Sequence, residues 1–319
     1  MGWIAIVITL FIEQLRALPA RNPVYLGINA AIGSAERGLN AGEPRHGVYA
    51  WWLVVGIAAL VVGGLYALLA WLSWFAALAF SVLVLYFCLG FRQFSHRFTA
   101  IQIALDAGDI AAAQRELTAW KSRREPLFTA ADLSADEVVR QTIEYGLLLA
   151  HRHVFGVFFW YLLLPGPVGP VVYRLADLLA RRWNERPTDG LPADSFGRFA
   201  RQAFAIIDWL PARLSALGFA IVGDFEGALY CWRRVVALQE GGKMPDSRSV
   251  LLAAAGGALG VRIMSKEQAI RYFDEPGNEG AGLAEPTTRA VRSAVGMVWR
   301  AMLLWLGLLL LLTLAGWLG

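Results

Sequence analysis

The chain has 319 residues, of which 57% are hydrophobic and only 17% are charged. Soluble domains average about 45–50% apolar and about 25% charged residues, so this composition predicts an integral membrane protein and excludes an ordinary soluble domain. The formal net charge is +4, and several arginines flank apolar runs as topology signals do, so we expect no nucleic-acid binding.

Apolar runs in the N-terminal third predict three membrane spans. The first eighteen residues form a hydrophobic helix that contains Glu13. Residues 48–91 carry no charge, and this run is about twice as long as one crossing needs. Three aromatic residues and Ser73 within 71–74 suit a turn at the membrane interface. We therefore expect spans at about 1–18, 48–70 and 72–91.

Residues 92–152 form the first long polar region. Its first half predicts two amphipathic helices hinged at 107–109. Ser134 followed three residues later by Glu137 is a capping-box pattern that opens a helix to about Ala150. Arginines lie on both outer sides of the preceding hydrophobic pair, so the positive-inside rule places this region in the cytoplasm.

The central hydrophobic segment, about 154–180, cannot be one straight helix. Its uncharged part, 154–173, is long enough to cross a bilayer core of about 30 Å. However, each proline inside a helix removes a backbone donor and clashes with the preceding turn, and lipid cannot satisfy the freed carbonyls. We therefore expect a broken or re-entrant segment, interrupted at Pro165, Gly166, Pro167, Gly169 and Pro170.

The C-terminal part predicts one further span and one ambiguous segment. Residues 203–223 are apolar but interrupted by charge and by proline, which fits either a kinked, half-buried segment or an interfacial helix. Residues 224–290 are mixed, with a turn at 241–245, and 301–319 are an uncharged span. Arginines place both termini outside a bacterial inner membrane, including those at positions 16, 21, 37 and 45.

The predicted fold is therefore all-α. We expect a polytopic integral membrane protein with about four to six hydrophobic segments, a proline-broken centre and cytoplasmic amphipathic helices, in one domain over 1–319.

Ionisable residues near the broken segment are the candidate site residues. Arg140, Glu144 and His151 fall on one helical face, which is either a polar site or a solvated face with one Arg–Glu pair. Arg174 and Asp177 pair either with each other or with residues of the 203–223 segment, and such groups at membrane depth carry function or brace one another. The ligand-binding candidates are Arg140, Glu144, His151, Arg152, Arg174, Asp177, Asp208 and Arg213, with Glu144 the catalytic candidate.

Metal binding is not expected. His151 and His153 are two residues apart, which points them to opposite sides of a helix, and no cysteine or carboxylate cluster completes a ligand set. The chain also shows no phosphate-binding glycine loop and no nucleophile with a histidine and an acid at recognisable spacing.

Several segments occur in an order that is typical of one family. They are IVITLFIEQLRALPARNPV near the N-terminus, LDAGDIAAAQREL at 105–117, LSADEVVRQTIEYG with GVFFW and GPVVYR in the centre, DWLPARLSAL at 208–217, and GALGVRI at 257–263. Together they resemble the CobD/CbiB family of membrane proteins, and more closely its AmpE-like branch. The resemblance to the synthase branch implies an enzyme that amidates adenosylcobyric acid with aminopropanol or its phosphate.

Most polar residues of the synthase branch are replaced in this chain. Glu144 keeps the first glutamate of the central segment. The family's Glu-Asn reads Leu148 and Leu149 here, its Asp-Gly reads Arg152 and His153, and its two aspartates and asparagine read Phe204, Ala205 and Asp208. Amide formation needs groups that hold the nucleotide's metal and take a proton from the amine. The AmpE-like branch lacks the same set, so this resemblance implies a non-catalytic accessory protein of cell-wall signalling and β-lactamase regulation.

Two alternatives stay open beside the AmpE-like interpretation. One is adenosylcobinamide-phosphate synthase, which implies a corrinoid ligand or a nucleotide with Mg²⁺. The other is a binder of a corrinoid or another small molecule. The expected partners are the lipid bilayer, a membrane or cell-wall signalling protein, and a second copy in a homodimer.

Overall fold

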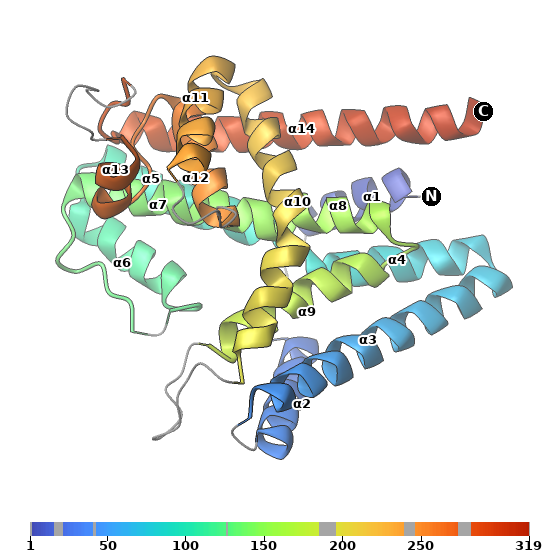
Figure 1. Ribbon diagram of the computed structural model, residues 1–319. Helices are drawn as coiled ribbons and strands as arrows, with labels where there is room; N and C mark the ends of the chain where they lie inside the picture. The colour runs from blue at the N-terminus through green and yellow to red at the C-terminus, as the bar shows by residue number, and fades with distance from the viewer. Residues whose placement is uncertain are drawn as a thin grey trace. The chain divides into compact units, whose positions relative to one another are not determined.

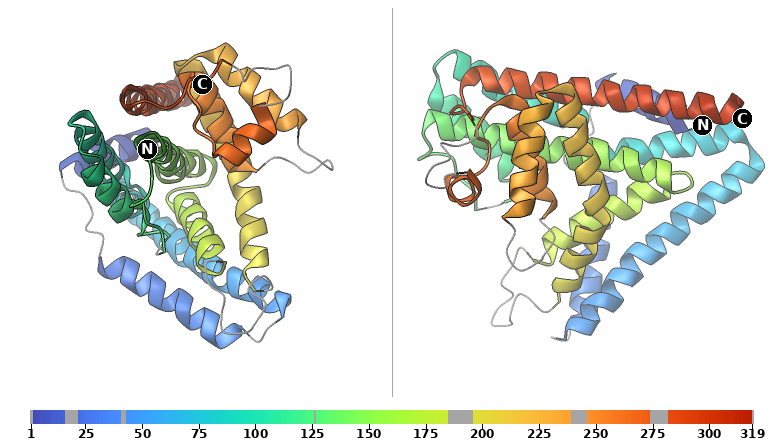
Figure 2. Two further views of the ribbon diagram at one scale, coloured as in Figure 1. Left: turned by 90° about the vertical axis from the view of Figure 1, so that its left-hand side faces the viewer. Right: turned by 45° about the horizontal axis from the view of Figure 1, so that its top comes forward.

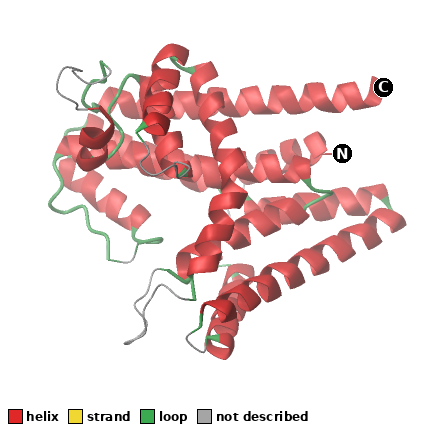
Figure 3. Cartoon of the chain, viewed as in Figure 1, coloured by secondary structure: helices red, strands yellow, loops and turns green. Residues whose placement is uncertain are grey.

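The computed structural model describes residues 2–15, 22–40, 43–125, 127–184, 196–238, 246–273 and 282–318. Helices form the regular structure of these residues, apart from one isolated parallel β-bridge between Val261 and Ala284 (Figure 1, Figure 3). The predicted all-α fold is confirmed. Arg16, Arg21 and the turn predicted at 241–245 lie outside the described residues.

The chain divides into two compact units. The first contains Met1–Gly90 and Arg152–Pro211, and the second contains Phe91–His151 and Ala212–Gly319. The expectation of one domain over 1–319 concerns both units together and stays a prediction.

The first unit is built from apolar helices. Its α3 and α4 pack against each other as a hairpin, the blue-to-cyan pair in Figure 2. The chain turns at Ser73, whose side chain accepts a hydrogen bond from the Phe75 amide and so caps α4. The helices of this unit are α1 (Gly2–Leu15), α2 (Pro23–Leu39), α3 (Pro44–Leu72), α4 (Trp74–Cys88), α8 (Gly156–Leu163), α9 (Val168–Arg182) and the first half of α10 (Arg198–Val222).

The central hydrophobic segment is broken where its prolines and glycines predict. Helix α8 ends before this cluster and α9 begins within it, with Pro170 in the first turn, where a missing amide is tolerated. Gly166 adopts a φ of +62°, the left-handed conformation that a tight turn needs. Gly169 lies so close to α8 that a Cβ added there would be 2.0 Å from the carbonyl oxygen of Trp160.

The second unit contains a helix hairpin packed beside long helices. Helices α11 and α12 approach backbone to backbone, since a Cβ added at Gly257 would lie 2.2 Å from the carbonyl oxygen of Gly227. Ser134 caps α7 by accepting a hydrogen bond from the Glu137 amide at 3.3 Å. The helices are α5 (Phe91–Asp106), α6 (Ile110–Lys121), α7 (Ala135–Ala150), α11 (Phe225–Ala237), α12 (Ser247–Leu259), α13 (Lys266–Phe273) and α14 (Thr288–Leu318).

Among the described residues, four helices are long and apolar enough to cross a membrane: Pro44–Leu72, Ala135–Leu163, Arg198–Val222 and Thr288–Ala315. Three shorter apolar helices accompany them, so the chain is a multi-pass membrane protein. Large apolar side chains on α3 are exposed, as expected of a surface that faces lipid; Leu60 and Trp71 are 77% and 84% exposed. The 29-residue helical run from Ala135 joins the region predicted as cytoplasmic to the central segment. The sequence-based spans and the cytoplasmic region 92–152 stay predictions.

We expect Gly169→Ala to destabilise the first unit. The carbonyl of Trp160 is backbone and cannot rotate away from the new Cβ, so α8 and α9 must move apart. The expected loss is about 1–3 kcal/mol, measured as a lower Tm in detergent. Gly64→Ala is the matched control, because nothing lies within 4 Å of that Cβ position and alanine favours helix. Equal Tm values for the two variants would contradict the close approach of α8 and α9.

Candidate functional site

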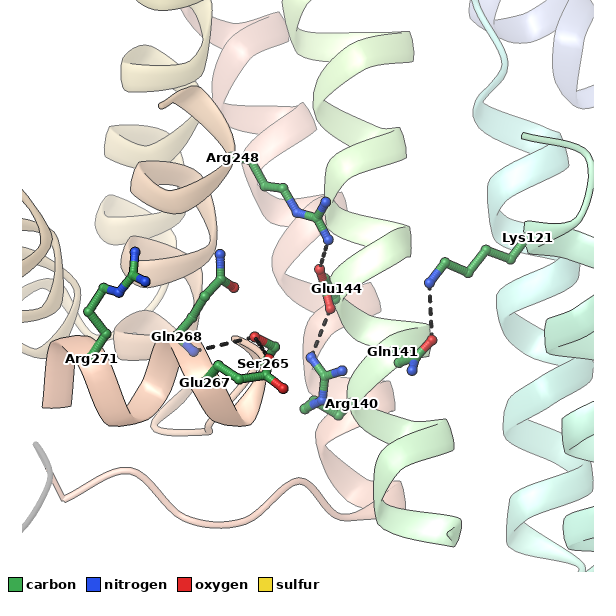
Figure 4. Close-up of a pocket in the computed structure, with 9 residues that line it drawn as sticks. All are labelled: Lys121, Arg140, Gln141, Glu144, Arg248, Ser265, Glu267, Gln268 and Arg271. Carbon is green, nitrogen blue, oxygen red and sulfur yellow. Dashed lines mark hydrogen bonds and ion pairs between the residues drawn. The ribbon is translucent and has the colours of Figure 1, made fainter. Parts of the chain in front are cut away.

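A polar pocket with a volume of about 400 Å³ lies in the second unit (Figure 4). Side chains of α6, α7, α12 and α13 and of the turn before α13 line it. The lining contains four basic and two acidic residues, which gives it a formal charge of +2. The nine residues are Lys121, Arg140, Gln141, Glu144, Arg248, Ser265, Glu267, Gln268 and Arg271.

Glu144 is held between two arginines in this pocket. One carboxylate oxygen accepts a hydrogen bond from Nη1 of Arg140 at 2.8 Å, and the other accepts one from Nη2 of Arg248. The glutamate is buried, whereas the side chain of Arg248 is 50% exposed. The buried carboxylate therefore has one buried partner and one that reaches solvent.

Arg140 braces the buried side of this pair. Its Nε and Nη2 donate to the two carboxylate oxygens of Glu137 at 2.8 and 2.5 Å. Its Nη1 also donates to the main-chain carbonyl of Ile263 at 3.0 Å. The guanidinium thus ties α7 to the turn before α13 and fixes the position of the Glu144 carboxylate.

The third residue predicted on this face of α7 is not in the pocket. His151 lies seven residues beyond Glu144, about 10 Å along the helix axis, at the start of a short π-helix, η1 (His151–Phe155). It is buried, and its Nδ1 lies 2.9 Å from the hydroxyl of Ser215. The structure therefore brings Arg140 and Glu144 together but leaves His151 in a separate contact.

Four of the remaining candidates, Arg152, Arg174, Asp177 and Asp208, lie in the first unit. Asp177 is fully buried, with Arg181, Arg174 and Arg152 at 3.0, 3.4 and 3.6 Å from its carboxylate oxygens. Asp208 is buried too and accepts a hydrogen bond from the Tyr173 hydroxyl at 2.7 Å. Arg213 belongs to the second unit, which resumes at Ala212.

Several site residues were not found from the sequence. Arg181 was detectable, because it lies four residues after Asp177, on the same helical face. Arg248 was not, because 104 residues separate it from Glu144 and nothing in the local pattern relates the two. Lys121 and Arg271 were missed for the same reason, since each comes from a different helix.

The donor set of the pocket suits an anion better than a metal. Both oxygens of Glu144 already accept bonds from guanidinium groups, so they are not presented to Mg²⁺. Among the described residues, no three His, Cys, Asp or Glu side chains gather as a possible ligand set. Burial raises the pKa of the Cys231 thiol to about 11, so this cysteine is not a thiolate nucleophile at neutral pH.

Comparison with known proteins matches the family model described as "CobD/Cbib protein" to residues 3–298. The "Cobalamin biosynthesis protein CobD" of Stutzerimonas stutzeri is 28% identical over 320 residues, which cover 99% of this chain and 98% of that protein. The protein of the same name from Chromobacterium violaceum is 29% identical over 307 residues, covering 94% and 93%. No solved structure matches the chain.

These findings correct the interpretation of the chain as an AmpE-like regulator, which is wrong. The curated relatives carry a name from cobalamin biosynthesis, and none supports signalling, β-lactamase regulation or a signalling partner. The error came from treating replaced carboxylates as evidence for another branch. A match over nearly the whole length decides the family instead: this chain belongs to the CobD/Cbib protein family.

Proposed function

We propose that this protein is an adenosylcobinamide-phosphate synthase of cobalamin biosynthesis. It would join a carboxyl group of adenosylcobyric acid to the amine of aminopropanol or its phosphate. The family match over residues 3–298 and the names of the relatives support this reaction class. We place the protein in the bacterial inner membrane, with both termini outside, and a homodimer stays a prediction.

The observation that carries the proposal is the cationic pocket around Glu144. This residue is the one carboxylate of the central segment that the family resemblance retains, and it lies among four basic side chains. Guanidinium groups bind carboxylate and phosphate with charge-assisted hydrogen bonds. Arg248 and Arg271 would therefore hold the acidic or phosphorylated end of a substrate beside Glu144.

The chemistry assigns distinct tasks to these groups. The amine nitrogen forms a bond to the carboxyl carbon, and one carboxyl oxygen leaves with a phosphoryl group from ATP. The amine must also lose a proton, which Glu144 would accept on the oxygen that the half-exposed Arg248 releases when it turns to the substrate. Basic side chains stabilise the negative charge that develops on the oxygens.

The pocket volume limits what enters it. About 400 Å³ holds a small molecule or one arm of a larger ligand, and a corrin macrocycle with its side chains is larger than that. We infer that a carboxylate arm or the aminopropanol part enters the pocket, while the macrocycle stays outside.

The replaced polar positions favour a second candidate, a corrinoid binder without catalysis. Leu148, Leu149 and Phe204 stand where the synthase resemblance implies acids or amides. Such a protein would bind adenosylcobyric acid and yield no amide. Binding and turnover must therefore be measured separately.

We expect the purified protein in detergent to bind adenosylcobyric acid, seen by corrinoid absorbance, and to turn it over with aminopropanol phosphate and ATP. Glu144→Gln should lower turnover by about 10²-fold or more, because the proton acceptor is lost. The control is Glu116→Gln, which removes a carboxylate that pairs with Arg97 in the same unit, away from the pocket. Binding of adenosylcobyric acid without turnover would favour the corrinoid binder over the synthase. If the folded protein does not bind adenosylcobyric acid, both functions are refuted.

The two arginines on Glu144 should behave differently when removed. Arg140→Ala leaves the buried carboxylate of Glu144 without its buried partner and should cost about 3–5 kcal/mol of stability. Arg248→Ala removes a half-exposed partner and should cost less than about 1 kcal/mol, yet weaken substrate binding about tenfold or more. Thermal unfolding and binding titrations in detergent measure the two effects. Unchanged affinity in Arg248→Ala would remove this arginine from the binding site.

A further inference from the structure

The cluster around Asp177 contains more cationic than anionic charge. Three guanidiniums surround this one carboxylate, and we call Arg152, Arg174 and Arg181 the arginine triad. Arg181 donates from Nε and Nη2 to the two Asp177 oxygens at 3.3 and 3.0 Å, Arg174 donates at 3.4 Å, and Arg152 lies at 3.6 Å. Even with the buried Asp208 included, three positive charges meet two negative ones.

The hydrogen-bonding capacity of the triad is also in excess. Each guanidinium carries five N–H donors, whereas a carboxylate offers about four lone-pair sites. One oxygen of Asp208 already accepts the Tyr173 hydroxyl. Arg174 also bonds to the Tyr25 side chain, and Arg152 lies 5.7 Å from the centre of the Phe204 ring. Fifteen N–H donors therefore share two carboxylates, which together offer about eight lone-pair sites.

The side chains of the triad are partly exposed although the carboxylate between them is not. The side chains of Arg152, Arg174 and Arg181 are 23%, 14% and 24% exposed, and that of Asp177 is 0% exposed. Asp177 thus gathers the guanidiniums from beneath, while each reaches the surface. Arg152 comes from the π-helix η1, and such helices occur frequently at functional sites.

We propose that the arginine triad binds a phosphate group, with Asp177 positioning the guanidiniums. Phosphate offers several strong acceptors to convergent guanidinium forks, and it would offset the excess buried charge. The group belongs either to the headgroup of an anionic lipid or to a free phosphate compound. The proposal does not rest on the synthase function, because the triad lies in the first unit and the Glu144 pocket in the second.

The first test measures phosphate binding by the full-length protein in detergent. Inorganic phosphate should raise the Tm of the wild type more than sodium chloride of equal ionic strength does. Arg152→Gln and Arg181→Gln should each weaken the apparent affinity about tenfold or more. Arg198→Gln is the matched control, because it removes one positive charge from an exposed position of the same unit. Equal phosphate responses in all four proteins, reflecting only a general salt effect, would refute a free phosphate ligand.

The second test covers variants that fold poorly. Asp177→Asn removes the internal carboxylate and leaves three neighbouring cations, so its Tm should fall in chloride. Phosphate should restore more Tm to this variant than to the wild type, because the anion replaces the lost charge. A loss of Tm that phosphate does not reverse would argue against the site.

The third test identifies the source of the phosphate. Native mass spectrometry after reconstitution in phosphatidylcholine with phosphatidylglycerol should show phosphatidylglycerol retained by the wild type and by Arg198→Gln, and lost from Arg181→Gln. This result assigns a lipid headgroup. A phosphate response in the first test without lipid retention assigns a free phosphate compound, and neither response in folded protein overturns the proposal.

Discussion

The need to neutralise buried charge determines where the polar residues of this protein lie. A carboxylate inside an apolar helical bundle is stable only with close cationic partners. Glu144 and Asp177 are both buried, and each gathers arginines from its own helix and from elsewhere in its unit. Arg140 shows how far one such contact extends, because it also holds Glu137 and the carbonyl of Ile263. Neutralising the buried charge of Glu144 therefore also ties α7 to the turn before α13 and fixes the position of the candidate catalytic carboxylate.

Much of the fold follows from local rules. Apolar runs, Ser73, Ser134 and the proline–glycine cluster give the helices and their breaks because each acts within a few residues. The spacing of charged residues along a helix also predicts the ion pairs between Arg140 and Glu144 and between Arg174 and Asp177. Arg248 and Arg271 depend on packing between helices far apart in sequence, which no local pattern encodes. His151 shows the limit of a shared helical face, since two turns separate it from Glu144 and it meets Ser215 instead.

Replaced side chains were a poor guide to the branch of the family. Substitutions such as Leu148 and Phe204 remove carboxylates from the positions that the resemblance emphasises, but they do not show that every polar group is gone. The structure assembles basic side chains from four helices around the glutamate that remains. A binding site built from scattered positions is compatible with a changed set of acids, which is why whole-length similarity outweighed single residues here.

The contact between Gly257 and Gly227 has a consequence for the motion of the pocket. Backbone atoms of α11 and α12 meet there directly, so no intervening side chain can repack to let one helix slide along the other. Helix α12 carries Arg248 in its first turn, and its register against α11 is therefore fixed. Arg248 can adjust to an arriving ligand by a change of rotamer, which for a half-exposed side chain occurs in picoseconds to nanoseconds. Adjustment at this arginine therefore needs no movement of α12 along α11.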